Sequence, residues 1–349
     1  MSLSYDALLV VSFGGPDRPD DVLPFLENVL RGRNVPRERM LEVAEHYRHF
    51  GGRSPINEQN RRLIAAIERH LAENGPPLRV YWGNRNWHPL LPDTLRKMAE
   101  DGIQRALAFV TSPYSSYSGC RQYREDIFRA QQEVGSSAPQ VDKLRAYFNH
   151  PGFIEPMIEC AEAALQQIPP QRREEALLVF SAHSVPLAMA QASQYEEQLR
   201  EACRLVAEGI HDSLSLREGA GVREPWHLVY QSRSGSPRQP WLEPDVGDFI
   251  EQQHGHSALK DVVVAPIGFI SDHMEVLYDL DTELAQRCER LGINMVRAAT
   301  VGTHPRFVQM IRELVIERIS DVPQRLSLGR FGPSHDVCPE GCCQYSPTR

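Results

Sequence analysis

The chain has 349 residues, of which 41% are hydrophobic and 24% are charged, and this composition is typical of a globular protein with room for two domains. Its net charge of −8 argues against a surface that binds nucleic acid or an anionic membrane. The N-terminus lacks the features of a signal peptide, and no run approaches the ~20 apolar residues of a spanning helix. We therefore expect a monomer in the cytoplasm, with no transmembrane anchor and with its seven cysteines reduced.

Short apolar runs alternate with amphipathic stretches through the first half of the chain. The run 7–13 ends at Gly14-Gly15-Pro16, which is typical of a buried strand followed by a tight turn. Gly14-Gly15-Pro16 lacks the spacing of a dinucleotide-binding loop, and no P-loop lysine follows it. Further strands are predicted at 78–82, 106–111 and 141–147, and helices at 20–31, 35–50, 58–74 and from residue 92.

The second half repeats this alternation. Strands are predicted at 176–181, 226–231, 262–267 and 293–298, and helices at 155–167, 195–213 and 307–319. Apolar strands that alternate with helices favour parallel sheets. The predicted fold class is therefore α/β, with two Rossmann-like doubly wound domains and a cleft between them. The predicted division is an N-terminal domain at 1–150, a C-terminal domain at 151–302, a helix at 303–323 that packs back on the first domain, and a tail at 324–349 without regular structure.

An acidic stripe follows the predicted strand 262–267. Glu275, Asp279 and Glu283 recur every four residues, so at about 100° per residue they share one face of a helix. Such a stripe is often ordinary solvated charge, and Asp272 with Glu275 resembles a capping box. The stripe nevertheless begins at the carboxyl end of a buried strand, where open α/β sheets bind ligands. A site for a hard or borderline cation is the functional alternative.

A histidine occupies the corresponding place after another predicted strand of the same half. His183 follows the run 176–181, so it should lie at the same sheet edge as the acidic stripe. A lone histidine in a loop is commonly structural. A histidine that faces a carboxylate across a cleft, however, can accept protons near neutral pH.

The segment between Arg31 and Arg53 is locally basic in an otherwise acidic chain. Ordinary helix-surface charge explains such a segment. The functional alternative is a rim that binds the carboxylates of an anionic substrate.

Cys338, Cys342 and Cys343 crowd into the end of the chain. A tetrahedral zinc site or an iron–sulfur cluster needs four ligands, so the fourth would come from Cys160 or Cys120. A free tail with incidental cysteines is the third possibility.

The chain resembles the ferrochelatases, enzymes that insert ferrous iron into a porphyrin, from about residue 8 to residue 314. The resemblance rests on motifs in a characteristic order: Ser12-Phe-Gly-Gly-Pro16, Gly52-Arg-Ser-Pro-Ile-Asn57, Gly83-Asn-Arg-Asn-Trp87, Ser181-Ala-His-Ser-Val-Pro186, Gln231-Ser-Arg-Ser-Gly235, Pro240-Trp-Leu-Glu-Pro244 and Pro266-Ile-Gly-Phe-Ile-Ser-Asp-His273. The phenylalanine of the first of these motifs, the motif that ends at Trp87 and the cysteine tail look most like those of the actinobacterial-type enzymes.

The resemblance implies roles for the residues singled out above. His183 would be the active-site histidine and Glu275 the carboxylate that faces it across the porphyrin, both in contact with the incoming Fe²⁺. Asp279 and Glu283 would continue as an acidic line along a helix that contains a π-type turn in this family. Such a widened turn aligns residues four apart better than an ideal α-helix does.

The resemblance also implies substrate contacts and a cofactor. Phe13 takes the place of a tyrosine that ligates the product iron in some relatives, and phenylalanine cannot do so. A [2Fe–2S] cluster would be held by Cys160 with Cys338, Cys342 and Cys343. The implied porphyrin contacts are Phe13, Arg31, Tyr47, Arg48, Ser54 and Tyr123.

Two porphyrins are candidate substrates. The basic segment suits coproporphyrin III, which has four propionates, and the alternative is protoporphyrin IX, which has two. Two rival functions also stand: a tetrapyrrole chelatase for cobalt or nickel, and a non-catalytic two-lobed protein that binds haem or metal.

Overall fold

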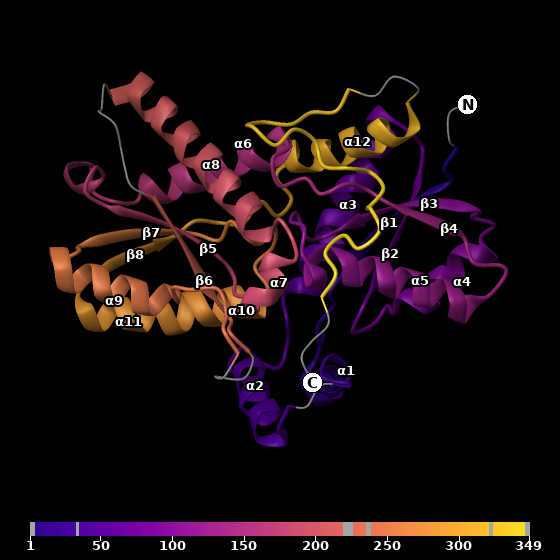
Figure 1. Cartoon of the computed structure of the whole chain (residues 1–349), viewed down its shortest axis with the longest axis horizontal. Helices are drawn as coiled ribbons and strands as arrows, with labels where there is room; N and C mark the ends of the chain where they lie inside the picture. The colour runs from indigo at the N-terminus through magenta and orange to yellow at the C-terminus, as the bar shows by residue number, and fades with distance from the viewer. Residues whose placement is uncertain (1–3, 33–34, 219–225, 235–238, 321–323, 346–349) are drawn as a thin grey trace.

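The computed structural model describes residues 4–32, 35–218, 226–234, 239–320 and 324–345. Two parallel sheets lie side by side, each flanked by helices (Figure 1). We call the part built on the first sheet the first lobe, and the part built on the second sheet the second lobe. The predicted α/β class with two doubly wound units is confirmed.

The four-stranded sheet of the first lobe has the strand order β2-β1-β3-β4. Every residue of the central strand β1 is buried, as expected for a strand covered by helices on both faces. Its strands are β1 Ala7–Ser12, β2 Arg79–Asn84, β3 Arg105–Val110 and β4 Gln140–Lys143.

The second lobe repeats the same arrangement with the order β6-β5-β7-β8, and all neighbours pair in parallel. Because β5 and β7 are the central strands, their carboxyl ends lie at the middle of one sheet edge, as the sequence predicts for His183 and the acidic stripe. The strands are β5 Leu177–His183, β6 Trp226–Gln231, β7 Asp261–Ala265 and β8 Asn294–Arg297.

The helices largely follow the predicted ranges. In chain order, the α-helices are α1 Val22–Val29, α2 Arg37–His49, α3 Ile56–Asn74, α4 Leu91–Glu100, α5 Gln122–Val134, α6 Pro151–Leu165, α7 Leu187–Gln191, α8 Tyr195–Glu218, α9 Val246–Ser257, α10 Met274–Val276, α11 Ala285–Leu291 and α12 Pro305–Ile319. Short 3₁₀ turns (η1 Pro19–Asp21, η3 Pro170–Arg172) and two π-helices (η2 Tyr117–Arg121, η4 Leu277–Leu284) complete the list.

Sequence reasoning missed α5, α7 and α9 and made β4 too long. In α5 only Tyr123, Ile127 and Ala130 are buried, so its apolar face is narrow. The run 141–147 leaves the sheet after Lys143, and its remaining residues pack into the core as a loop. Burial therefore continues where strand pairing has stopped, and an apolar run alone does not mark that point.

Helix α12 lies against α3 of the first lobe and α6 of the second. Near its end Glu317 forms a buried ion pair with Arg145, with Nε to Oε2 at 2.7 Å and Nη2 to Oε1 at 2.8 Å. The helix thus packs on both lobes, and residues 321–323 of the predicted 303–323 unit lie outside the described ranges.

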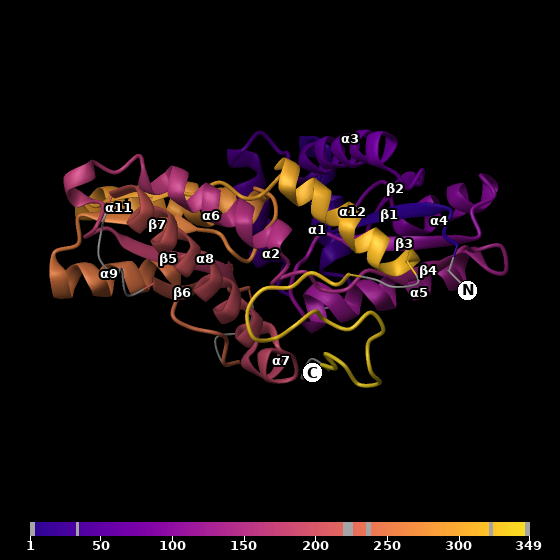
Figure 2. The ribbon, with the colours of Figure 1, turned by 90° about the horizontal axis from the view of Figure 1, so that it is seen from above.

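The described tail, residues 324–345, contains no helix or strand, as predicted (Figure 2). It runs along both lobes. The Arg330 N–H donates to Glu201 of α8 at 2.9 Å, and the Arg121 guanidinium of η2 donates to the Cys342 carbonyl at 3.0 Å. Across the described ranges, no helix combines the length and apolar character needed to cross a bilayer.

Candidate active site

His183 is the last residue of β5, whereas the sequence predicts a strand that ends at Ser181, with His183 just past it. The hydroxyl of Tyr195 donates to its backbone carbonyl at 3.0 Å, which fixes the end of the strand. The ring Nδ1 contacts the Ser184 carbonyl, so Nδ1 carries a proton. The other nitrogen, Nε2, faces the carboxylate of Glu275.

Oε2 of Glu275 lies 3.6 Å from Nε2 of His183. Glu275 stands at the start of α10, where the N-cap is His273: its Nδ1 accepts the Glu275 backbone N–H at 3.2 Å. The predicted capping box is therefore wrong. The Asp272 carboxylate turns away to Arg297 at 2.9 Å and Thr300 at 3.2 Å.

The two groups form an ion pair. Burial disfavours the charged imidazole, but the Glu275 carboxylate and the Ser184 carbonyl outweigh it and raise the pKa of His183 to about 8. Burial likewise disfavours the carboxylate, yet His183 prevails and lowers the pKa of Glu275 to about 2. At pH 7 only about a tenth of His183 is neutral, so the pair rests as imidazolium and carboxylate.

The acidic line continues along η4, and its π-helical form confirms the widened turn implied by the family resemblance. Asp279 is partly buried; it accepts hydrogen bonds from Ser232 and, at 3.3 Å, from Gln231. Burial raises the pKa of Asp279 to about 7, and Ser232 opposes that rise. Glu283 is exposed at the outer end of the line.

The apolar side of this helix packs into the second lobe. Leu280, Leu284 and Cys288 are buried in its core. Leu277 is only partly buried, and Val276 takes the core position instead. The π-helix changes the angular step between residues, which an ideal 3.6-residue period does not anticipate.

Aromatic side chains of the first lobe pack against this part of the second lobe. Phe25 and Tyr47 form one cluster with Met274 of α10. His46 of α2 stacks on Tyr278 of η4, with ring centroids 3.7 Å apart and planes 10° from parallel. Burial, and then the Glu275 carboxylate, raise the pKa of Tyr47. The first lobe therefore meets the acidic helix directly beside Glu275.

The predicted porphyrin contacts divide into exposed and buried groups. Phe13, at the end of β1, is 37% exposed and lies edge-on to Phe25. Arg31 is exposed, as is Arg48, which pairs with Glu45. These side chains are open to an anionic ligand.

Three of the predicted contacts are buried, and one of them is Tyr47, which is 9% exposed within the aromatic cluster described above. Ser54 is 7% exposed, and its N–H donates to the Pro16 carbonyl at 2.9 Å. Tyr123 is 5% exposed beneath the Arg85 guanidinium, which lies 4.5 Å from its ring centroid. The structure thus places Tyr123 in the core rather than at a surface. Sequence reasoning missed Arg85, although it stands in the Gly83–Trp87 motif directly after β2.

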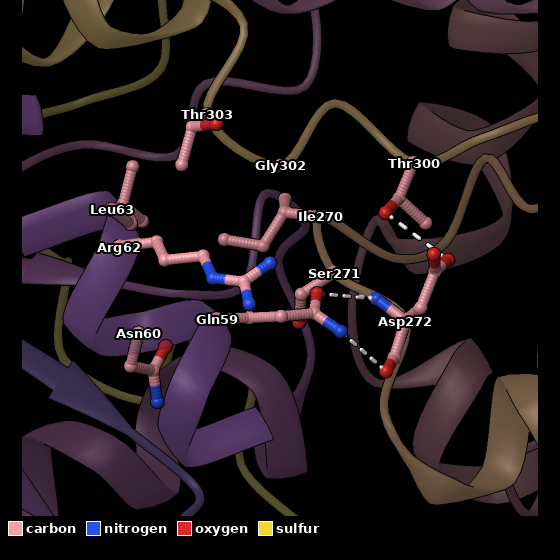
Figure 3. Close-up of a pocket in the computed structure, with 10 residues that line it drawn as sticks. All are labelled: Gln59, Asn60, Arg62, Leu63, Ile270, Ser271, Asp272, Thr300, Gly302 and Thr303. Carbon is pink, nitrogen blue, oxygen red and sulfur yellow. Dashed lines mark hydrogen bonds between the residues drawn. The ribbon is translucent and has the colours of Figure 1, made fainter. Parts of the chain in front are cut away.

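A pocket of ≈ 260 Å³ lies between the lobes, beside the loop that precedes α10 (Figure 3). Gln59 and Arg62 of α3 line it from the first lobe, and Asp272 and Thr300 line it from the second. Its walls are mostly polar, and the hydrogen bonds across it join the two lobes.

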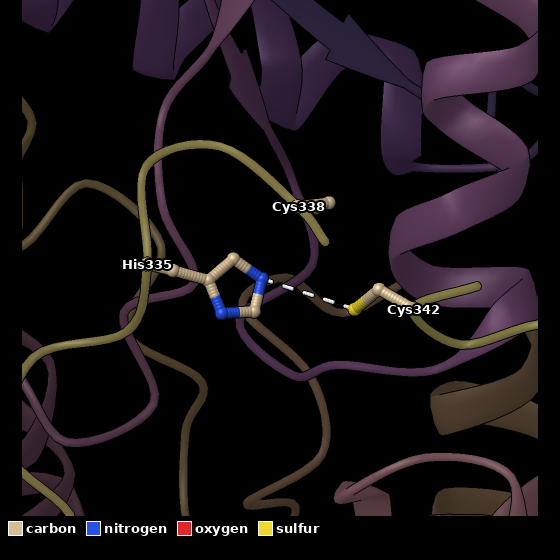
Figure 4. Close-up of side chains that lie close together, drawn as sticks. All are labelled: His335, Cys338 and Cys342. Atoms are coloured by element: carbon tan, nitrogen blue, oxygen red, sulfur yellow. Dashed lines mark hydrogen bonds between the residues drawn. The ribbon is translucent and has the colours of Figure 1, made fainter. Parts of the chain in front are cut away.

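The tail cysteines gather beside η2. Figure 4 shows His335, Cys338 and Cys342 close together, with ligand atoms within 4.8 Å of one another. The Sγ atoms of Cys342 and Cys343 are 3.7 Å apart. The hydrogen bond with Cys338, together with the positive charge of Lys143, lowers the pKa of the Cys120 thiol to about 5. Cys120 therefore belongs to the same group of thiols as the tail.

Cys160 does not. It lies on α6 with its Sγ 3.9 Å from the Thr300 carbonyl, and burial raises its pKa to about 11. The structure places Cys120, the alternative ligand that the sequence left open, beside the tail cysteines, whereas Cys160 faces the connection between β8 and α12.

The two-lobed fold is similar to that of solved chelatase structures. SirB from Bacillus subtilis, solved with Fe³⁺, matches with a TM-score of 0.53 and 10% identity, over 91% of this chain and 97% of that one. A multi-domain protein from Deinococcus radiodurans described as similar to chelatases matches with a TM-score of 0.51 and 16% identity, over 91% of this chain and 56% of that one. At these identities the likeness concerns the fold alone.

The family follows from the sequence comparison. The profile of the ferrochelatase family matches residues 5–319. A ferrochelatase of Rhodopirellula baltica is 57% identical over 347 residues, covering 99% of this chain and 95% of that protein. A coproporphyrin III ferrochelatase of Streptomyces coelicolor is 51% identical, covering 97% and 93%. The chain belongs to the ferrochelatase family.

Proposed function

We propose that this protein inserts ferrous iron into coproporphyrin III, giving iron-coproporphyrin III (coprohaem) in haem biosynthesis. The observation that carries the proposal is the His183–Glu275 ion pair at 3.6 Å, which lies beside the aromatic cluster of the first lobe. Relatives named coproporphyrin III ferrochelatase support the choice of porphyrin, among them proteins of Streptomyces coelicolor and Frankia alni at 51% and 53% identity.

The chemistry requires three things of the protein. A planar porphyrin must bend, two pyrrole N–H protons must leave, and hydrated Fe²⁺ must lose water. Phe13 is 37% exposed and, backed by Phe25 and Tyr47, offers aromatic surface to grip the ring, so binding energy from the ring's periphery can support a bent form. His183 accepts a pyrrole proton once it is neutral, and Glu275 stabilises the resulting imidazolium.

The acidic line serves the metal and the second proton. Asp279 has a pKa near neutral, so it can take up or release a proton at little cost. Glu283 is exposed and offers a first carboxylate to hydrated iron at the outer end of the line. Phe13 has no hydroxyl, so it leaves the product iron without an axial oxygen ligand from this side.

Loss of iron insertion in His183→Ala tests the catalytic assignment. The variant should lose nearly all turnover while it still binds porphyrin, because the ring contacts come from the first lobe. His256→Ala is the control, since it removes an exposed histidine of α9 whose Nδ1 contacts the Gln252 carbonyl at 2.7 Å. Near-normal turnover in His183→Ala would contradict the assignment of His183 as the catalytic base.

Comparison of the two porphyrins tests the substrate. Purified protein should metallate coproporphyrin III with a higher kcat/KM than protoporphyrin IX. Arg31→Ala combined with Arg48→Ala should narrow that difference by raising KM for coproporphyrin III, because both arginines are exposed and their positive charges suit the two additional propionates. Equal or faster turnover of protoporphyrin IX by the unaltered protein would identify that porphyrin as the substrate instead.

We further propose that the thiols of Cys120, Cys338, Cys342 and Cys343 hold a [2Fe–2S] cluster. The donor set fits, since four thiols are gathered around η2: Cys120 contacts Cys338, Cys338 lies close to Cys342, and the Sγ atoms of Cys342 and Cys343 are 3.7 Å apart. A bound cluster would supply one-electron chemistry and a covalent tie between tail and first lobe.

The colour of the purified protein separates the two ligand sets. Cys120→Ser should lose the visible absorption of an iron–sulfur cluster, and Cys160→Ser should keep it. A colourless protein that contains zinc would refute the cluster and favour a site built on His335, Cys338 and Cys342.

We also place the protein in the cytoplasm as a monomer. All seven cysteines are free in the structure, which suits a reducing compartment. Cell fractionation and sedimentation at equilibrium check the two parts of this placement.

A further inference from the structure

We propose that Gln59 is a positioning residue, through which the first lobe holds the loop that carries His273 and Glu275. Its side chain reaches from α3 to the backbone of Asp272. Nε2 donates to the Asp272 carbonyl at 2.7 Å, and Oε1 accepts the Asp272 N–H at 2.8 Å (Figure 3). This inference rests on the proposed function, because it concerns the geometry of the same catalytic pair.

The contact fixes orientation as well as distance. One planar amide satisfies both backbone groups of a single residue, so the peptide at Asp272 can neither rotate nor slide without losing a bond. The loop is irregular between the end of β7 and the start of α10, so no sheet ladder holds Asp272. At the other end of this loop, the Tyr114 hydroxyl donates to the Ile267 carbonyl at 2.9 Å. The first lobe therefore holds the loop at two points.

The Asp272 side chain carries the restraint into the second lobe. Its carboxylate accepts from Arg297 at the end of β8, and the same guanidinium binds Asp281 of η4. Thr300 adds a hydrogen bond at 3.2 Å. Asp272 is thus the point where the first lobe, β8 and the acidic helix are joined.

The next residues along the chain are functional. His273 caps α10 by accepting the Glu275 N–H, so displacement of Asp272 moves the cap and the carboxylate together. His183 stands on the central strand β5 and does not follow. The His183–Glu275 separation of 3.6 Å therefore depends on where Gln59 holds the loop.

Gln59→Leu tests the proposal, since it keeps a side chain of similar size and removes both hydrogen bonds. We expect kcat for iron insertion to fall roughly 10- to 100-fold, with KM for porphyrin changed by less than about threefold, as for loss of alignment at a reacting centre. Gln59→Glu keeps the acceptor for the Asp272 N–H but sets an anionic oxygen against the Asp272 carbonyl. Its kcat should therefore fall as far as that of Gln59→Leu.

Arg62→Gln is the matched control. Arg62 lines the same pocket from the same helix, but its guanidinium pairs with Glu58 of that helix at 3.0 Å. The kcat and KM of Arg62→Gln should stay within about twofold of those of the unaltered enzyme, since substitutions of exposed side chains that hold no part of the loop have small effects.

The titration of His183 distinguishes positioning from a merely structural role. The titratable groups that act on its ring are the carboxylates of Glu275 and Asp279 and the imidazole of His273, whose pKa burial lowers. If the loop moves, Glu275 recedes, and the midpoint of the His183 NMR titration should fall in both Gln59 variants and stay unchanged in Arg62→Gln.

This measurement needs no turnover, so it tests the positioning separately from the proposed reaction. An unchanged midpoint in the Gln59 variants, or a kcat within twofold of the unaltered enzyme, overturns the proposal. A loss of activity that merely parallels a lower melting temperature, with the midpoint unchanged, overturns it as well.

Discussion

A single proton decides the state of the pair formed by His183 and Glu275. Glu275 holds the pKa of His183 at about 8, above its ordinary value near 6.5, and its own falls to about 2. The ion pair therefore exists between those two values. Its contribution to folding stability is lost as pH falls through the carboxyl pKa, or as pH rises through the imidazole pKa. Catalysis needs the neutral imidazole, so activity and ion pairing oppose each other.

The first prediction concerns the pH dependence of iron insertion. Because His183 must be neutral to accept a proton, kcat/KM should rise with pH and level off above about 8. Glu275→Gln removes the carboxylate, and burial then favours the neutral imidazole. The midpoint of the curve of kcat/KM against pH should therefore lie at a lower pH in this variant than in the unaltered enzyme. Steady-state rates from pH 6 to 9 measure both curves. An identical midpoint in Glu275→Gln would contradict the assignment of this limb to His183.

At this scale the sequence predicts the residues that end strands but not their contacts. His183 and Glu275 were found because each follows a buried run that leads to the same sheet edge. Gln59, Arg85 and Ser232 were missed, because each acts through a partner distant in sequence. Cys160 was preferred over Cys120 for the same reason, since spacing alone does not say which helix the tail crosses.

The π-helix η4 is the element that turns a sequence repeat into a line of carboxylates. It exposes Glu283, half-buries Asp279 and keeps Leu280 and Leu284 in the core. The acidity of the line is therefore graded: burial leaves Asp279 near neutrality, and the pair with His183 leaves Glu275 strongly acidic.

The second prediction follows from the hydrogen bond between Ser232 and Asp279. That bond lowers the pKa of Asp279, so Ser232→Ala should raise it and protonate more of this carboxyl at pH 7. Loss of about 1 kcal/mol for one hydrogen bond raises the pKa by about 0.7, so the ionised fraction of Asp279 and with it the apparent affinity for ferrous iron at pH 7 should fall roughly threefold and recover near pH 9.

Initial rates at varied iron concentration measure this effect. Ser257→Ala, which removes a surface hydrogen bond to Gln253 on α9, should leave the apparent affinity for iron unchanged at both pH 7 and pH 9. A loss that persists at pH 9 would point to a distorted loop instead of a protonated carboxyl.

Elements with strong apolar periodicity were predicted well, and those with weak periodicity were not. The central strands and α3, α6, α8 and α12 lie within a few residues of their predicted ranges. Helices α5 and α9 bury few side chains each, so their patterns resemble loops. The π-turn came from the family resemblance, because an interval of four also fits an ordinary α-helix.

At the scale of the molecule, α12 and the tail join the two lobes. Arg145 follows the first sheet and Glu317 lies on α12, and their side chains are 1% and 3% exposed. Arg145 also donates to the Leu326 carbonyl of the tail at 2.7 Å. This single guanidinium therefore holds lobe, helix and tail together.

The third prediction tests that junction. Arg145→Met removes both hydrogen bonds to the buried Glu317 carboxylate and leaves it only the distant Arg325 guanidinium at 4.0 Å, so it should lower the free energy of unfolding by about 3 kcal/mol. Combining it with Glu317→Leu should recover most of the loss, because no buried charge then remains. Urea unfolding measures both values.

The control for Arg145 is an exposed ion pair. Arg39 and Glu42 are 49% and 59% exposed, so Arg39→Met should cost less than about 1 kcal/mol. Equal losses in Arg39→Met and Arg145→Met would show that burial does not set the strength of the junction.

The aromatic and basic surface belongs to the first lobe, whereas His183, Glu275, Asp279 and Glu283 all belong to the second. This separation has a consequence for how such an enzyme can evolve. Mutations that alter the size or charge of the accepted ring accumulate in segment 13–54 without touching a proton-transfer group. Substrate range can therefore diverge between descendants while the chemistry stays constant, provided that the loop before α10 keeps its anchor on α3.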